Sequence, residues 1–231
     1  MFLTGANRGL GLALAAELIE AGHEVYGSAR ESAPTDLLAL DPAGIVQLDQ
    51  ADEASVDAGI AALAELTPTL DVLINCAGAD ARAFGSPEDR RGPFDLDGET
   101  FTNVLRVNVT GPMLITRAAL PLLQRGVDAM IINISSQLGS MEVAATSGRD
   151  TAYCVSKAAL NNYSVKAAGA LRDEEIGVVM VHPGWVQTDM GGERAPMTVD
   201  ESSAALASLV EKLTLADTGR FVRWDGTDHP W

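Results

Sequence analysis

The chain has little cysteine and no apolar run long enough to cross a membrane. Its 231 residues include two cysteines, Cys76 and Cys154, so a disulfide framework or a thiolate metal site has little support. The longest apolar runs, 130–134 and 178–181, are far shorter than the roughly 20 residues that span a bilayer, and no charged-then-apolar leader precedes them. We therefore expect a cytoplasmic protein with no membrane partner and no metal.

Basic residues are also scarce. Lysine occurs only at positions 157, 166 and 212, and the formal net charge is −16. Nucleic acids and anionic membranes are bound through clustered Lys and Arg, which release counterions on binding. The charge balance therefore argues against a nucleic-acid partner, and the expected partner is a small molecule.

What the sequence does contain is a regular alternation of apolar runs and helical periods. This alternation predicts an α/β fold in one domain over residues 1–231, a Rossmann-like doubly wound parallel sheet of about seven strands with helices on both faces. The expected strands are 2–4, 24–28, 45–48, 72–75, 130–135, 178–182 and 221–223, and the expected helices are 10–21, 56–66, 99–124, 151–172 and 199–213. Gly22 is expected to stop the first helix, Pro112 to bend the third, and Thr198 with Glu201 to cap the last. Segments 79–98 and 137–150 read as loops at the carboxyl ends of strands, where ligands bind in such sheets.

A glycine-rich turn joins the first strand to the first helix. Its residues are Thr4, Gly5, Asn7, Arg8, Gly9, Leu10 and Gly11. Glycines at such a turn let backbone N–H groups approach phosphates without an intervening Cβ, although they also serve in ordinary turns. No Gly-Lys-Ser/Thr follows, so the turn favours a dinucleotide over a nucleoside triphosphate.

The end of the second strand bears on which dinucleotide is bound. It runs Tyr26-Gly27-Ser28-Ala29-Arg30, with no carboxylate at the place where an NAD enzyme accepts the ribose 2′-hydroxyl. A guanidinium there can bind the extra phosphate of NADP, and Arg8 can approach the same phosphate. The alternative is that both arginines are ordinary solvated side chains. We predict NADP as the cofactor, with NADPH preferred over NADH.

A second signal lies in the helix expected over 151–172. Tyr153 and Lys157 share a face at i and i+4, and a nearby ammonium favours the phenolate of a tyrosine. The phenol then becomes a usable acid or base. Ser136, or its competitor Ser135, ends the strand that faces the start of this helix, which would place a hydroxyl beside the phenol.

These motifs occur in a familiar order, and the chain resembles the short-chain dehydrogenases/reductases over essentially its whole length. The order is the glycine turn, Asn75-Cys76-Ala77-Gly78, Asn108, Ser136, Tyr153 with Lys157, and Pro183-Gly184. The segments 182–192 and 224–231 look like the subgroup of the C-factor signalling protein and the sniffer-type carbonyl reductases. By this resemblance the catalytic residues are Asn108, Ser136, Tyr153 and Lys157. It also implies that the cofactor is contacted by Tyr153 and Lys157 and by Asp49, Gln50, Asn75, Ala77, Gly78, Pro183, Gly184, Val186 and Thr188. These residues add to the glycine turn and Arg30.

The resemblance implies an NADP-dependent carbonyl reductase or alcohol dehydrogenase in which tyrosine exchanges a proton with the substrate. A cofactor-binding signalling protein of the C-factor kind, with little or no turnover, is the alternative. The family also implies a homodimer or homotetramer, and the candidates for a second apolar surface are Leu114, Ala118, Leu160 and Ala168. The first strand is shorter than is usual in the family, and Cys76 replaces a common asparagine. The candidate pocket walls are Leu138, Met141, Val143, Trp185 and Met190.

Overall fold

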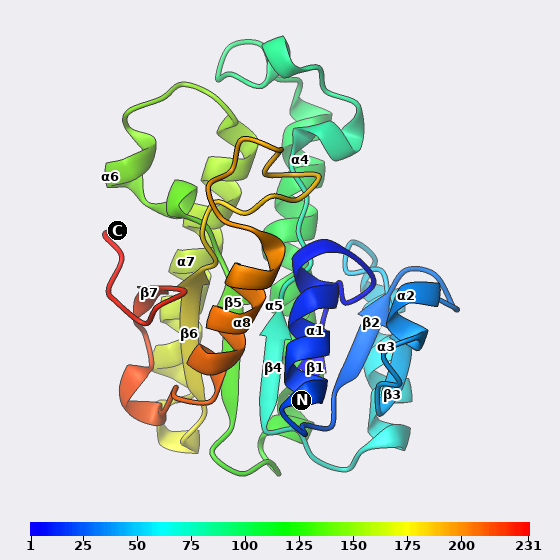
Figure 1. The fold of residues 1–231 in the computed structure, drawn as a ribbon. Coiled ribbons are helices and arrows are strands. Elements are labelled where there is room, and N and C mark those ends of the chain that lie inside the picture. Colours follow the sequence, from blue (N-terminus) through cyan, green and yellow to red (C-terminus); the bar gives the residue numbers. More distant parts are fainter.

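A single parallel sheet forms the centre of the molecule (Figure 1). The computed structural model describes residues 1–231, except for the side chain of Glu88. The strands are β1 (Phe2–Leu3), β2 (Tyr26–Ala29), β3 (Gly44–Gln47), β4 (Val72–Asn75), β5 (Met130–Ile134), β6 (Gly177–His182) and β7 (Phe221–Arg223). Their order is β3-β2-β1-β4-β5-β6-β7, and every pair is parallel. The expected doubly wound α/β sheet of seven strands is therefore confirmed.

The two-residue strand β1 lies at the centre of this sheet despite its length. Phe2 is in register with Tyr26 of β2 and Leu73 of β4, and both residues of β1 are fully buried. The order of strands reverses on the two sides of β1, since β2 and β3 lie on one side and β4 to β7 on the other. The space beyond the carboxyl ends of β1 and β4 is thus the point where ligands bind in folds of this type.

Helices cover both faces of the sheet, as expected. The α-helices are α1 (Gly9–Glu20), α2 (Thr35–Leu38), α3 (Glu53–Leu66), α4 (Gly98–Leu105), α5 (Gly111–Leu123), α6 (Met141–Ala144), α7 (Thr151–Ala170) and α8 (Val199–Val210). Short 3₁₀ turns are η1 (Ala81–Phe84), η2 (Glu88–Arg90), η4 (Gln137–Gly139), η5 (Arg172–Glu174) and η6 (Leu215–Asp217). Apolar side chains of α1 and α8 pack on one face of the sheet, and those of α3, α5 and α7 on the other.

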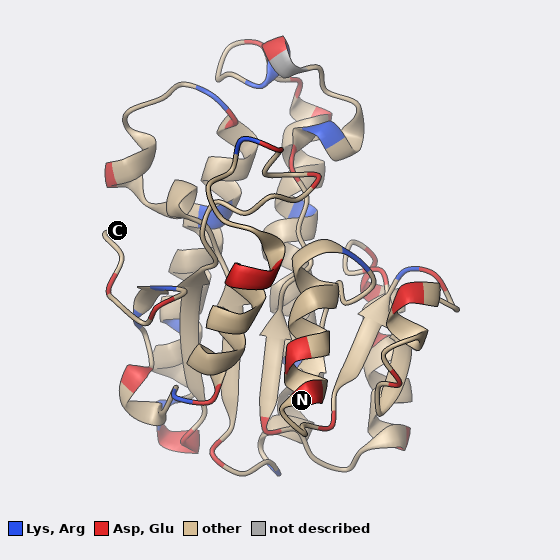
Figure 2. Ribbon diagram, in the orientation of Figure 1, with Lys and Arg blue, Asp and Glu red and all other residues tan. Residues whose placement is uncertain are grey.

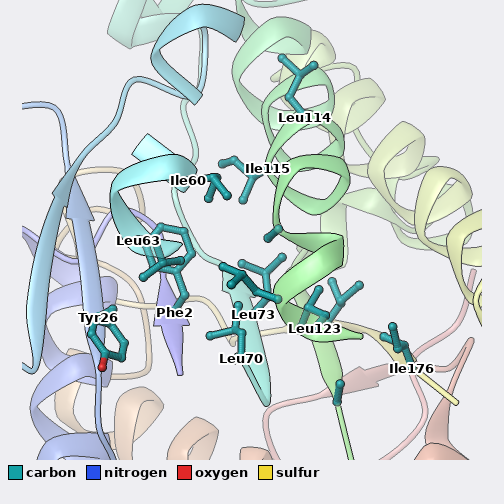
Figure 3. Packing of buried hydrophobic residues seen from close by; sticks show 14 of the residues in the cluster. Phe2, Tyr26, Ile60, Leu63, Leu70, Leu73, Leu114, Ile115, Leu123 and Ile176 are labelled. Carbon is teal, nitrogen blue, oxygen red and sulfur yellow. The ribbon is translucent and has the colours of Figure 1, made fainter. Parts of the chain in front are cut away.

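Alternation along the strands divides the core into these two layers. Successive side chains of a strand point to opposite faces, so Phe2 enters one cluster and Leu3 the other. Figure 3 shows the layer that contains Phe2, with Leu63, Leu73 and Ile115 between the sheet and helices α3 and α5. Because both faces are covered, the strands read as nearly continuous apolar runs in the sequence.

The helix expected over 99–124 is broken in the middle. A π-helical segment η3 (Arg106–Thr110) separates α4 from α5, and the N–H of Gly111 donates to the carbonyl of Arg106, five residues back. Pro112 follows immediately and has no N–H to offer the preceding turn. The break therefore precedes the proline that was expected to bend the helix, and it places Asn108 inside the irregular segment.

The predicted helix ends agree with the structure. Gly22 adopts φ +90°, and its N–H donates to the carbonyl of Ile19 at 2.9 Å as α1 ends. Thr198 and Glu201 form a reciprocal capping box at the start of α8. The four-residue helices α2 and α6 were not expected. The second lies in the segment 137–150 that was interpreted as a loop, and no element was expected over 35–38.

The apolar surface expected on the outer faces of the third and fourth helices is not formed by the residues proposed for it. Leu114, Leu160 and Ala168 are buried in the chain's own core, because their side chains face the sheet, and Ala118 is partly buried. Val155 and Val165 are the exposed aliphatic side chains of α7. Leu114, Leu160 and Ala168 are therefore not available to form an exposed apolar surface.

Charge is distributed as the composition suggests. Figure 2 shows acidic segments on most outer helices and turns, whereas basic positions are fewer and largely scattered. Among the described residues, no helix combines the length and the apolar character that a membrane span requires.

Candidate active site

Four loops gather beyond the carboxyl ends of the central strands, at the top of Figure 1. They follow β1, β4, β5 and β6, and long-range contacts tie them together. Arg82 of the loop after β4 donates to the carbonyl of Met190 after β6. Arg91, also after β4, pairs with Asp150 at 3.0 Å, at the start of α7. The loops thus form one connected wall around the ends of β1, β4 and β5.

The glycine turn after β1 has the shape of a phosphate cradle. Gly5 and Gly9 adopt φ +68° and +53°, and a Cβ on Gly11 would lie 2.2 Å from the carbonyl oxygen of Gly5. No side chain in the described structure caps the start of α1, whose first turn has no acidic residue. The N–H groups and the positive end of the helix dipole therefore remain available to an anion, and the turn fits the pyrophosphate of a dinucleotide.

Thr4 and Leu10 attach the glycine turn to the rest of the protein. The Thr4 hydroxyl oxygen accepts from the N–H groups of Cys76 and Ala77, both at 3.1 Å, and Thr4 is almost fully buried. A Cβ on Gly5 would also lie 2.9 Å from Ala77. Leu10 packs on the core beneath α1. Thr4 therefore holds the ends of β1 and β4 in contact, which positions both the turn and the segment 76–78.

The two side chains expected to bind the NADP 2′-phosphate, Arg30 and Arg8, have different surroundings in the structure. Arg30 is exposed at the end of β2. Arg8 donates to Asp189 at 2.9 Å, with both side chains largely exposed, so in this structure its partner is the loop after β6. A carboxylate also reaches this end of the cleft, because Asn7 donates to Glu31 at 3.1 Å. The sequence analysis stopped at Arg30 and overlooked Glu31.

Asp49 and Gln50 follow β3 and mainly shape the backbone. The Asp49 carboxylate accepts from the N–H of Ala51 at 2.9 Å. A hollow of about 370 Å³ is lined by Arg30, Asp49 and five neighbours, and Tyr153 is not among them. The hollow therefore lies toward the adenosine end of the expected cofactor position.

Gln50 links the end of β4 to the break between α4 and α5. Its amide donates to the carbonyl of Ala77 at 3.1 Å and to that of Val107 at 2.8 Å. Val107 lies five residues before Pro112, which has no N–H to satisfy this carbonyl in the π-helical pattern. Gln50 therefore replaces the missing donor, and the absence of a side chain on Gly111 leaves room for it.

Asn75 lies at the end of β4 but turns its side chain into the protein. Its amide donates to Asn133 at 2.8 Å, and the Asn133 amide donates to Ser164 of α7 at 2.7 Å. These three side chains are buried, and they join two strands to the helix that carries Tyr153. In this structure Asn75 thus positions α7, whereas Ala77 and Gly78, the next residues along, face the site. Gly78 lies beside Asn108 and the Lys157 amine.

The two adjacent serines after β5 interact with different residues. Ser135 is buried and donates to the Asn161 side chain at 2.6 Å. The Ser136 hydroxyl lowers the pKa of the Tyr153 phenol, and its oxygen accepts from the N–H of Leu138 at 3.1 Å. The structure therefore pairs Ser136, the serine preferred from the sequence, with the phenol.

Burial dominates the acid–base properties of Tyr153. It raises the pKa of the phenol above its usual value, while the Ser136 hydrogen bond acts in the opposite direction. A neighbouring cation was expected to lower the pKa of this phenol, whereas burial raises it. At neutral pH the phenol therefore holds its proton and can serve as an acid.

Lys157 is buried below Tyr153 on the same face of α7. Its Nζ donates to the carbonyl of Ile134 at 2.8 Å and lies 5.6 Å from the centre of the Tyr153 ring. Burial lowers the pKa of this amine to about 8, opposed by the nearby Cys76. The amine is therefore close to its titration range at neutral pH, unlike a surface lysine.

Asn108 uses its whole side chain to hold the loop after β4. Its oxygen accepts from the N–H of Ala79 at 2.8 Å, and its amide donates to the carbonyl of Ala79 and the hydroxyl of Ser156 at 2.7 and 2.9 Å. The residue is fully buried. Any part that Asn108 takes in a proton relay would thus involve its main chain, since the side-chain amide already bridges Ala79 and α7.

The segment after β6 closes the site from the remaining side. Gly184 adopts φ +96° and packs on Met197, and Pro183 accepts a 2.6 Å hydrogen bond from Ser202 of α8. Val186 is buried beside Met197, and a Cβ on Gly9 would lie 3.9 Å from the methyl group of Thr188. The segment therefore lies directly against the glycine turn.

Of the candidate pocket walls, three are exposed to an incoming substrate. Met141, Trp185 and Met190 are 74%, 48% and 37% exposed, whereas Leu138 and Val143 are half-buried. The Trp185 indole donates to the carbonyl of Gly191 at 2.8 Å, which fixes the ring on its own loop. The mouth of the site thus offers apolar surface on the loops after β5 and β6.

A family model described as short chain dehydrogenase matches residues 1–198. The protein belongs to the short chain dehydrogenase family. This assignment agrees with the fold and with the order of the glycine turn, Ser136, Tyr153 and Lys157, and it makes the chain a member of an oxidoreductase family.

Two solved structures match this short chain dehydrogenase over its whole length, and a further relative matches most of it. The NADPH-bound carbonyl reductase from chicken fatty liver superposes with a TM-score of 0.89 and 31% identity, covering 100% of this chain and 98% of that one. The carbonyl reductase Sniffer of D. melanogaster superposes with a TM-score of 0.89 and 30% identity, covering 100% of this chain and 98% of that one. The C-signal protein of Myxococcus xanthus is 36% identical over 167 residues, which are 71% of this chain and 95% of that protein.

Sequence reasoning missed Asp80 and Arg82 of this short chain dehydrogenase. The Asp80 carboxylate is buried, and Arg82 binds it through both Nε, at 2.8 Å, and Nη2. Both residues fall in the segment 79–98 that was read simply as a loop. The available signal was an acidic residue two positions after Gly78, at the edge of the sheet where the ligand was expected.

Proposed function

We propose that the protein is an NADP-dependent carbonyl reductase in which Tyr153 donates a proton to the carbonyl oxygen of a small aldehyde, ketone or quinone. The observation that carries the proposal is the phenol of Tyr153 with the Lys157 amine 5.6 Å from its ring centre, at the switch point of the sheet. Burial raises the pKa of this phenol and the Ser136 hydroxyl lowers it. When bound, the nicotinamide cofactor supplies the hydride. The enzyme's own residues then hold the oxygen and move the proton.

The arrangement assigns each residue a distinct task. The Ser136 hydroxyl, which lowers the pKa of the phenol, would bind the same carbonyl oxygen and stabilise the charge that develops on it. Tyr153 would transfer its proton from Oη to that oxygen. The buried amine of Lys157, held by the carbonyl of Ile134, would limit the cost of the phenolate that remains.

Cofactor binding would rely on the backbone more than on side chains. The glycine turn and the uncapped start of α1 suit the pyrophosphate, and Arg30 is the side chain available to a 2′-phosphate. Three of the similar structures are described as bound to NADPH or NADP: the chicken carbonyl reductase and short-chain dehydrogenases from Burkholderia multivorans and Burkholderia cenocepacia. These relatives support NADP, while Glu31 beside the turn is the feature that disfavours a 2′-phosphate.

The proposal is tested by replacing Tyr153→Phe and following NADPH consumption with a panel of aldehydes, ketones and quinones. We expect kcat to fall about 10³-fold, because the proton donor is lost, while the NADPH dissociation constant from cofactor fluorescence stays at the wild-type value. Tyr163→Phe is the matched control, since Tyr163 lies on the same helix and hydrogen-bonds Thr116 instead. Wild-type turnover by the Tyr153→Phe variant would contradict the role.

A second candidate function is a cofactor-binding signalling protein with little turnover. The 36% identity to the C-signal protein favours it. The two candidates differ in one measurement, because a signalling protein would bind NADPH and yet leave it unoxidised in the presence of every carbonyl tested. Under that outcome the site would serve to stabilise the fold by bound cofactor.

A further inference from the structure

The segment 224–231 has no part in the tyrosine, serine and lysine scheme. After β7 it turns back on itself, since the N–H of Arg223 donates to the carbonyl of Thr227 at 2.8 Å. Asp228 then pairs antiparallel with Val222 of β7. Figure 1 shows the segment, in red, rising from β7 toward α6. It therefore runs from the edge strand of the sheet to the loop after β5.

The first residue of this segment contacts the loop after β6. The Trp224 ring meets the His182 ring edge-on, with centroids 5.6 Å apart, and a Cβ on Gly184 would lie 3.6 Å from the same indole. His182 is buried at the end of β6 and directly precedes Pro183-Gly184, the stretch expected to hold the cofactor. Trp224 therefore packs directly against that stretch.

The last residue of the segment contacts α6, in the loop after β5. A main-chain oxygen of Trp231 accepts from the N–H of Glu142 at 3.2 Å, and the Ser140 hydroxyl accepts from the N–H of Val143 at 3.2 Å. The first N–H groups of a helix have no partner within the helix, so both bonds satisfy the start of α6 from outside. The Trp231 ring lies 5.6 Å from the ring of Phe221 in β7. Trp231 therefore connects α6 to the edge strand.

His229 lies between these two contacts. Its ring is 5.2 Å from that of His182 and 4.9 Å from that of Phe221, and its Nδ1 accepts from Nε of Arg223 at 3.2 Å. Burial lowers the pKa of both histidines, that of His182 to about 3, so both rings are neutral at pH 7 and pack without repulsion. His229 is thus fixed against β6 and β7 at once.

We propose that the segment 224–231 is a brace that positions the loops after β5 and β6, with His229 as its central positioning residue. Trp231 holds α6, whose exposed Met141 lies at the mouth of the site, and Trp224 holds the loop after β6. The kinetic consequences rest on the proposed function, whereas the contacts between the loops depend on no reaction. A brace of this kind predicts that its two ends act on different loops.

The experiment compares Trp231→Ala, Trp224→Ala and His229→Ala with the wild type by hydrogen-exchange mass spectrometry. Trp231→Ala should increase exchange over 137–144 about three- to tenfold and leave 182–190 at the wild-type rate, because one aromatic contact contributes roughly this factor to local opening. Trp224→Ala should do the reverse. His229→Ala should increase exchange in both loops, because its ring lies between them.

Kinetics and binding should separate in the same way. Trp231→Ala should raise KM for the carbonyl substrate about three- to tenfold, with kcat and the NADPH dissociation constant near the wild-type values, because α6 lines the substrate entrance. Trp224→Ala should instead raise the NADPH dissociation constant by a similar factor, because it supports the stretch expected to hold the nicotinamide. Steady-state kinetics and cofactor fluorescence measure both.

Conservative variants and a control from the same segment complete the test. Trp231→Phe and Trp224→Phe keep an aromatic ring and should restore most of the protection from exchange. Trp231→Leu and Trp224→Leu keep apolar volume without the ring, and they give the same comparison if an alanine variant does not fold. Asp228→Asn is the control, since the Asp228 carboxylate pairs with Arg220 at 2.8 Å, and it should change neither loop.

The outcomes separate the brace from the proposed reductase activity. If the folded Trp231 and Trp224 variants exchange as the wild type does, or if each increases exchange evenly throughout the protein, the brace is refuted, whatever the enzyme reduces. Equal effects of both variants on both loops would refute it as well. If exchange responds loop by loop but no carbonyl is turned over, the brace stands and the proposed reductase activity fails.

Discussion

The two halves of the site are built in different ways. On the side of β1 to β3, the glycine turn offers backbone N–H groups, and the charged side chains around it, Arg8, Arg30 and Glu31, are exposed. On the side of β4 to β6, buried side chains such as Asn108, Ser135 and Lys157 are held by specific hydrogen bonds. The first half can exchange its surface charges at low cost, whereas each side chain of the second half is tied to the stability of the core.

The pair of adjacent serines gives the sharpest contrast within the buried half. We expect Ser136→Ala to lower kcat about 10²-fold with little change in stability, because a donor to the reacting oxygen is lost. Ser135→Ala should lower the free energy of unfolding by about 1–3 kcal/mol, because the Asn161 oxygen loses its buried donor. Steady-state kinetics and urea denaturation of both variants measure these effects, and the reverse assignment would mean that Ser135 is the reacting serine.

The buried amine of Lys157 should make the stability of the protein depend on pH. Its pKa is about 8 in the folded protein and 10.5 ordinarily, so the unfolded chain binds more protons between these values and stability rises with pH there. The burial cost is fully present below pH 8 and vanishes above pH 10.5. Between those limits the wild type should gain up to about 3 kcal/mol of unfolding free energy relative to Lys157→Met.

Lys166→Met is the control for this measurement, since Lys166 is exposed on the same helix. Its unfolding free energy should follow the wild type across the whole pH range. Parallel curves for the wild type and Lys157→Met would show that the buried amine keeps an ordinary pKa. The contrast between a buried and an exposed half would then lose its electrostatic basis.

Substitutions in the exposed half should change only the affinity for the cofactor. We expect Arg30→Ala to weaken NADPH binding about tenfold and to leave NADH binding unchanged, because only NADPH carries the phosphate that the guanidinium would bind. Glu31→Gln should leave NADPH affinity equal or higher, since it removes a negative charge from the same end of the cleft. Isothermal titration with both cofactors measures this, and an equal loss for NADH would assign Arg30 a purely structural role.

The fold was largely predictable because its signals are local. The seven strands are short apolar runs bounded by polar turns, and Gly22 and the Thr198 capping box define helix ends through bonds between near neighbours. The π-helical break at Arg106–Thr110 was not predicted, although Pro112 marked its region. It depends on Gln50, 57 positions away from the carbonyl of Val107 that it satisfies.

Taken alone, the sequence determined the elements, the glycine turn, and the spacing that puts Tyr153 and Lys157 on one face of a helix, since these follow from backbone geometry within a few residues. Only the tertiary structure decided which side chains meet. It paired Arg8 with Asp189 across 181 positions, joined Ser135 to Asn161, allowed Ser136 to act on the pKa of Tyr153, and paired Asp80 with Arg82. Partners and pKa values depend on burial and on charges contributed by distant segments, and these exist only once the sheet has assembled.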